Sequence, residues 1–221
     1  MKFTDIGYRG NFLQLPPHAR VNADSGTIML GTSYGDPNLT ETIFEEWDRE
    51  YLSSNQDLDI TSPFPKLTCL DGVANRIYTT VLYLNDFIYN QYNKEEYAEA
   101  FEFIILQKFN SRLYWAQIGW PMMFLSAPNH IRPLDSSTGF RTLTPDQAPN
   151  IPSNLLGIER SVNFRIESAN IKDDEEIFFV KANSIPSHFY SHLNQSNEDL
   201  LKILYQENPD QGAWLGRVSF R

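Results

Sequence analysis

The order of its periodic segments is the strongest constraint on how this 221-residue chain can fold. Two segments, 39–51 and 67–88, repeat apolar residues at every third or fourth position, as one face of a helix requires. A block of short β-branched or aromatic runs follows them, broken by Asn-Ser, Trp-Pro and Ala-Pro-Asn turns. The chain therefore gathers its helices and its strands into separate blocks, which is typical of an α+β protein.

The remaining segments complete this order. Strands are predicted at 2–8, 27–31, 101–107, 111–119, 122–125, 130–134, 161–168, 176–181 and 214–220, and two more helical segments at 185–193 and 197–206. The Pro/Asn/Gly-rich passage 15–26 predicts a loop, and Asn38 with Glu41 predicts a capping box at the first helix. We expect a four-layer α/β/β/α sandwich of two mainly antiparallel sheets flanked by helix pairs.

Composition excludes several classes of function. The net charge of −10 repels phosphate backbones and anionic membranes, so nucleic acid and membrane partners are not expected. No apolar stretch approaches the roughly 18 residues of a spanning helix, and the first residues lack the apolar core of a signal peptide, which predicts a cytoplasmic protein. The single cysteine, Cys69, cannot form an internal disulfide or a zinc cage; beside Leu67 and Leu70 it is expected to be a buried thiol.

Short motifs at the ends of the expected strands carry a resemblance to a known family. They are Gly7-Tyr8-Arg9-Gly10-Asn11, Gly31-Thr32-Ser33-Tyr34-Gly35, Ile118-Gly119 ahead of Met123-Phe124-Leu125, Val180-Lys181-Ala182-Asn183-Ser184, and Asp210-Gln211. In order and spacing this set resembles the metal-dependent serine/threonine protein phosphatases of type 2C, which carry Asp-Gly, Gly-Asp-Ser-Arg, Ser-Asp-Gly and Asp-Asn motifs there. The resemblance covers nearly the whole chain and implies a single type 2C phosphatase-like domain over residues 1–221.

The reaction of that family needs two divalent ions bridged by carboxylates, because hard cations prefer charged oxygen ligands. The matching positions here are mostly uncharged: Leu13 or Gln14 at the first acid, Thr32 or Ser33 at Asp-Gly, Ser184 at Ser-Asp-Gly and Gly119-Trp120-Pro121-Met122 at the turn. An alternative register of the first loop, through Arg20 to Asp24 instead of Arg9 to Asn11, recovers one acid. The resemblance therefore implies a pseudophosphatase with no catalytic residue and no bound metal.

A few side chains remain candidates for a site. Arg9 matches the arginine that holds the substrate phosphate in the family, although an arginine at a strand end is commonly a plain surface cation. Asp36, a few positions late, and Asp210, which falls on a family ligand, are vestigial metal candidates, although a lone aspartate is commonly a turn residue. His188 and His192 lie four apart on an expected helix, but this spacing alone favours a helix surface over a metal pair.

Three functions are consistent with these patterns. The first is a catalytically inactive phosphatase-like domain that binds another protein, as a regulatory or scaffolding module without a cofactor. The second is an active phosphatase with a shifted manganese or magnesium site built from Asp24, Asp36 and Asp210. The third is a sensor that holds a small ligand near Arg9 in the emptied cleft.

Overall fold

The chain forms two compact units, each built on its own sheet. A computed structural model describes residues 1–9, 16–56, 63–128, 130–134, 154–182, 184–207 and 209–220. Unit 1 comprises Met1–Pro16, Pro121–Ile151 and Ile171–Arg221, and unit 2 comprises Pro17–Trp120 and Pro152–Asn170. The chain therefore enters each unit more than once, although each sheet takes most of its strands from consecutive stretches of sequence.

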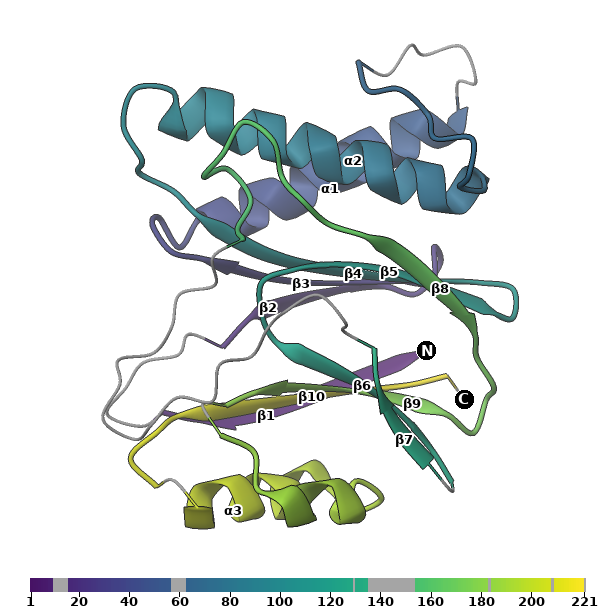
Figure 1. Cartoon of the computed structure of the whole chain (residues 1–221), viewed down its shortest axis with the longest axis vertical. Coiled ribbons are helices and arrows are strands. Elements are labelled where there is room, and N and C mark those ends of the chain that lie inside the picture. The colour runs from purple at the N-terminus through teal and green to yellow at the C-terminus, as the bar shows by residue number, and fades with distance from the viewer. Residues whose placement is uncertain are drawn as a thin grey trace. The chain divides into compact units, whose positions relative to one another are not determined.

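Unit 2 contains an antiparallel sheet in the order β2-β3-β4-β5-β8. Its strands are β2 (His18–Asn22), β3 (Thr27–Ser33), β4 (Phe101–Phe109), β5 (Arg112–Ile118) and β8 (Ile166–Asn170). Helices α1 (Leu39–Gln56) and α2 (Gly72–Ile88) lie side by side on this sheet, and a π-helical turn, η1 (Tyr89–Asn93), extends α2 (Figure 1).

The core of unit 2 is formed by the apolar stripes of the two helices. Side chains at helical spacing from α1 and α2 pack on alternate residues of β3, β4 and β5, among them Ile43, Trp47, Ile77, Val81, Leu84, Met29, Phe103 and Ile105. Most of these side chains are fully buried, and each such burial contributes about 1.5–3 kcal/mol. The apolar residues that recur every three or four positions in the sequence thus form the helix faces that pack on the sheet.

Unit 1 contains a second antiparallel sheet in the order β1-β10-β9-β6-β7. Its strands are β1 (Lys2–Tyr8), β6 (Met122–Ala127), β7 (His130–Pro133), β9 (Glu176–Lys181) and β10 (Ala213–Ser219). A 3₁₀ helix, η2 (Ser187–His192), and helix α3 (Asn197–Glu207) pack on one face of it through Phe189, Leu200 and Leu204. Within the described part of the chain, no helix combines the length and apolar character needed to cross a bilayer.

The α+β class and the two antiparallel sheets confirm the prediction, with several differences in detail, among them the start of β8 at Ile166 instead of residue 161. Strand β2 occupies part of the predicted loop 15–26; it is a mostly exposed edge strand whose pairing with β3 gives little apolar signal. Helix α2 begins at Gly72, because the Asn75 side chain bonds the backbone of Leu67 and Leu70 and holds them in a turn. The predicted helix 185–193 is a 3₁₀ helix.

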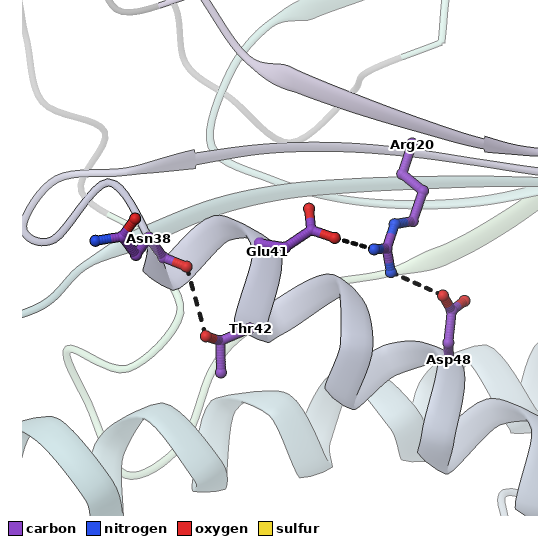
Figure 2. A network of polar contacts seen from close by, with 5 residues as sticks. All are labelled: Arg20, Asn38, Glu41, Thr42 and Asp48. Atoms are coloured by element: carbon purple, nitrogen blue, oxygen red, sulfur yellow. Dashed lines mark hydrogen bonds and ion pairs between the residues drawn. The ribbon is translucent and has the colours of Figure 1, made fainter.

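The predicted capping box of α1 does not form. The Glu41 side chain pairs with Arg20 on β2, and Arg20 also donates to Asp48 at 2.9 Å (Figure 2). Asn38 donates through its backbone and side-chain nitrogens to Asp36 Oδ1, both at 2.9 Å, while its carbonyl accepts from Thr42. The missed strand β2 thus supplies the arginine that draws Glu41 away from the helix end and holds α1 to the sheet.

The prediction of a buried Cys69 is wrong. Its side chain is exposed, because residues 67–70 form a turn before α2 instead of the first turn of a buried helical face.

Asp71 caps the N-terminus of α2. Its carboxylate accepts from the Ala74 N–H at 2.9 Å and from the Tyr114 hydroxyl on β5 at 2.8 Å. Burial opposes the charged form, but these hydrogen bonds and the nearby Arg112 outweigh it, so the pKa of Asp71 lies below its ordinary value. The side chain therefore ties the helix start to the sheet.

We expect Asp71→Ala to lower the free energy of unfolding by about 1–2 kcal/mol, because the cap and the contact to Tyr114 are lost together. Asp86→Ala, an exposed aspartate on the same helix, is the matched control and should change stability little. Urea denaturation of both variants measures the difference.

Comparison of wild type with Asp71→Ala also tests how the stabilisation by Asp71 depends on pH. The lowered pKa means that the contribution of Asp71 is complete above the pKa of an unfolded aspartate, about 3.9, and is lost as the pH falls through the folded value. The gap between wild type and Asp71→Ala should therefore narrow below about pH 4, and a constant gap down to pH 2 would contradict this assignment.

Candidate functional site

The connection from β3 to α1 lies at the position of the predicted metal motif. Residues 34–38 leave the end of β3 beside the start of β4, where two glutamates, Glu99 and Glu102, are 8% and 1% exposed. Carboxyl groups at this depth need hydrogen-bond donors, because burying them without partners costs several kcal/mol. The donors come from the end of β3, from the β3–α1 connection and from Trp120.

Glu99 binds the backbone of this connection. The Asp36 N–H donates to Glu99 Oε1 at 2.8 Å and to Oε2 at 3.0 Å, and the Ser33 hydroxyl donates to Oε2 at 3.2 Å. The Gly35 N–H donates to Ser33 Oγ at 3.3 Å. A Cβ on Gly35 would lie 2.2 Å from Glu99 Oε2, so the close approach of the carboxyl group requires glycine there.

Asn93, the last residue of η1, fixes the position of Glu99. Its Oδ1 accepts from the N–H groups of Ala98 and Glu99, both at 2.8 Å, and its Nδ2 donates to the Glu99 carbonyl at 2.6 Å. The same nitrogen donates to the Gly157 carbonyl at 2.7 Å. The π-helical turn therefore places the buried Asn93 amide where it bonds both the N–H and the carbonyl group of Glu99.

Glu102 forms a second buried cluster on β4. Its Oε1 accepts from the Tyr34 hydroxyl at 2.7 Å and from the Trp120 N–H at 3.3 Å. Burial, and then the nearby Glu102, raises the pKa of Tyr34 well above its ordinary value, so the phenol remains a donor at neutral pH. Gly119 has a positive φ of 81°, and a Cβ there would lie 2.7 Å from Glu102 Cγ.

Thr32 lies directly opposite Glu102 in the β3–β4 register. Its side chain is 2% exposed, and its hydroxyl has no hydrogen-bond partner among the described residues. A single neutral hydroxyl beside one carboxyl group is a weak donor set for a hard cation.

The residues present do not fit a pair of divalent ions. Such ions need several charged oxygens directed at one point, but here the glutamate oxygens accept hydrogen bonds from protein donors, among them the Trp120 N–H. Over the described ranges, no three side chains of the His, Cys, Asp and Glu types are grouped closely enough to hold a metal ion. The hydrogen bonds to Glu99 and Glu102 instead hold the β3–α1 connection against the start of β4.

The predicted site residues belong to both units. Arg9 is exposed at the end of β1 in unit 1, and Asp210 lies in an exposed turn before β10 in the same unit. Asp36 belongs to unit 2, where its Oδ1 accepts from Asn38. Leu13 and Gln14 lie outside the described residues.

Two alternative metal sites are not supported by the positions of their residues. Asp24 lies in the turn before β3 and Asp36 follows its far end, so a seven-residue strand of about 20 Å separates them. The rings of His188 and His192 are 6.0 Å apart, but His192 Nδ1 lies 2.8 Å from the His188 carbonyl oxygen, within hydrogen-bond distance. Neither set brings a group of ligands together.

Sequence reasoning missed the two glutamates. It named Ser33, Asp36 and Trp120 only at positions matched to the family's metal motifs, and not as hydrogen-bond donors. The available signal was Phe101-Glu102-Phe103, an acid within a strand that is otherwise apolar from residue 101 to residue 106. A charged residue there must find partners inside the protein. The identity of those partners depends on contacts 63 to 68 residues away along the chain.

Comparison with known proteins gives the fold but no sequence relatives. No family model and no curated protein sequence matches the chain. Among solved structures, PppA of Pseudomonas aeruginosa, a key regulatory component of the T6SS, aligns with a TM-score of 0.70 at 10% identity over 99% of this chain and 97% of its own. The Mycobacterium tuberculosis serine/threonine phosphatase PstP/Ppp aligns with a TM-score of 0.68 at 11% identity over 99% and 97%.

A third structure carries metal ions. The catalytic domain of the serine/threonine phosphatase PstP in complex with two manganese ions aligns with a TM-score of 0.64 at 14% identity over 98% of this chain and 96% of its own. These alignments span the whole chain, so the chain has the α+β fold of the type 2C serine/threonine phosphatases, as the motifs predicted. At such low identity the likeness concerns the fold.

We expect Gly35→Ala to lower the free energy of unfolding by about 1–3 kcal/mol, because the added methyl group displaces the Glu99 carboxyl group from the Asp36 N–H. Gly72→Ala is the matched control: a Cβ at this position in α2 meets nothing within 4 Å, and the substitution should be neutral or stabilising.

A double-mutant cycle identifies the cause. In a Glu99→Ala background the added methyl group has no carboxyl group to displace, so most of the cost of Gly35→Ala should disappear. An equal cost in both backgrounds would show that the clash with Glu99 is not responsible.

Proposed function

We propose that this chain is a phosphatase-like domain that has lost metal-dependent catalysis and acts by binding another protein, in a regulatory or scaffolding role. The observation that carries the proposal is the engagement of Glu99 and Glu102 by protein donors at the position of the metal motif. Carboxyl oxygens that accept hydrogen bonds from protein donors have fewer lone pairs left for a divalent ion, and Thr32, Ser33 and Trp120 add no charged ligand.

A regulatory role has a parallel among the solved structures of the same fold, since PppA is a key regulatory component of the T6SS. The PstP catalytic domain in complex with two manganese ions is the metal-bound case with which this chain is contrasted. In this chain the fold remains while the described residues form no group of metal ligands, so binding is the function that the scaffold can still perform. We propose no catalytic residue and no cofactor.

The charge of the chain indicates the kind of partner. A net charge of −10 disfavours nucleic acid and anionic membrane surfaces, and favours a protein with a basic surface. We propose that the encounter takes place in the cytoplasm.

Isothermal titration of manganese and magnesium into the metal-stripped chain tests the loss of the metal site. We expect no binding heat up to millimolar ion, no shift of the melting temperature, and no hydrolysis of a generic aryl phosphate, because no charged ligand set exists among the described residues. Asp210→Ala is the matched variant and should be indistinguishable from wild type.

Micromolar binding of manganese that is lost in Asp210→Ala would contradict the proposal, above all if phosphoester hydrolysis is lost with it. Such a result would restore an active metal-dependent phosphatase as the function.

A further inference from the structure

A row of aromatic rings lies on the surface of unit 2 next to the site described above. The Tyr83 and Phe87 rings on α2 stack at 6.4 Å between centroids, and Phe87 meets Tyr92 of η1 edge to face at 6.1 Å. Tyr83 and Phe87 also pack on the core of the unit, so one side of each ring is fixed. Tyr92 is 37% exposed. The row therefore presents rigid rings that remain partly accessible.

Acidic groups surround the Tyr92 end of this row. Asn93, next to Tyr92, binds the backbone of Glu99, and the Glu99 carboxyl group binds the Asp36 N–H, so the exposed Asp36 lies beside η1. Burial, and then the carboxylates of Glu99, Asp36 and Glu46, raises the pKa of Tyr92. Three carboxylates therefore lie close enough to Tyr92 to act on its hydroxyl group.

The loop after η1 carries further acidic side chains. Glu95, Glu96 and Tyr97 are exposed, and Tyr97, with 73% of its surface accessible, is the most exposed of the large apolar or aromatic side chains in the described residues. Residues 86–99 contain four acidic side chains and one basic one, Lys94. The segment that carries Phe87, Tyr92 and Tyr97 therefore has a net negative charge.

Rigid aromatic faces next to carboxylates suit one class of ligand above others. An arginine guanidinium stacks on a tyrosine or phenylalanine ring and pairs with a neighbouring carboxylate, and both interactions strengthen as water leaves the surface. Aromatic residues with such fixed geometry are also the usual anchors of protein interfaces.

We propose that the surface formed by Tyr83, Phe87, Tyr92 and the acidic loop 95–97 binds an arginine-rich segment of a partner protein. The inference rests on the proposed partner-binding function and adds the chemistry of the partner. The guanidinium groups lie on the exposed ring of Tyr92, with Asp36 and the glutamates of the loop as their counter-charges.

Fluorescence anisotropy with a labelled peptide of alternating arginine and glycine tests this surface, with a glutamate–glycine peptide of equal length as the negative probe. We expect the arginine peptide to bind at low salt and to weaken as the salt concentration rises, and the glutamate peptide not to bind. Tyr92→Leu should weaken binding about tenfold, whereas Tyr92→Phe should retain most of it because the ring face is kept.

The matched controls lie on α3, in the other unit. Tyr205→Leu removes a ring of 52% exposure and should leave the affinity unchanged. Replacing both Glu95 and Glu96 by Gln should weaken binding more than the same double replacement at Glu198 and Glu207, which alters the net charge equally. A thermal melt of each variant checks that it remains folded.

The inference is overturned if the arginine peptide does not bind, if both peptides bind alike, or if Tyr92→Leu and Tyr205→Leu behave alike. These outcomes leave the absence of a metal site untouched. Conversely, tight manganese binding would overturn the proposed function whatever the peptide does, so the two failures are distinguishable.

Discussion

The hydrogen bonds between the Glu99 carboxyl group and the Asp36 N–H connect two parts of unit 2 that lie 63 residues apart in the sequence. They hold the start of α1 against the start of β4, and Asn93 holds Glu99 in turn. Glu99 is only 8% exposed, and a carboxyl group buried in this way is stable only with such donors. The path of the β3–α1 connection and the burial of Glu99 therefore depend on each other. Gly35 permits this arrangement, since any side chain at that position would occupy the space of the carboxyl group.

This arrangement also determines what the site can do. In a metal-dependent phosphatase, carboxylates at strand ends are directed at cations, which supply the hydroxide for the reaction. Here Glu99 and Glu102 accept hydrogen bonds from the Ser33 hydroxyl at the end of β3, from the Tyr34 hydroxyl and from the backbone N–H groups of Asp36 and Trp120. The chain has the fold of the type 2C phosphatases, and the polar groups at this strand end bond to one another.

The sequence predicted the fold better than the site, for physical reasons. The helices of unit 2 were predictable because a stripe at three-to-four spacing, such as Ile43 with Trp47 or Ile77 with Val81, must lie on something flat. Strand β2 was missed because an exposed edge strand depends on its ladder to β3 and shows no apolar alternation. The prediction of an Asn38–Glu41 capping box was wrong because Arg20, on that same strand, forms an ion pair with Glu41. Glu99 and Glu102 could be noticed as acids near an apolar strand, but their donors are set by long-range register.

The central claim is that buried carboxyl groups, and not metal ions, hold the β3–α1 connection. Amide hydrogen exchange at Asp36, followed by NMR, tests it most directly, because Asp36 is an exposed residue whose N–H is shielded by the bonds to Glu99. The account predicts a protected Asp36 amide in the metal-free chain, no change on adding manganese, and loss of protection in Glu99→Ala. An Asp36 amide that exchanges freely in the metal-free chain and becomes protected when manganese binds would contradict it.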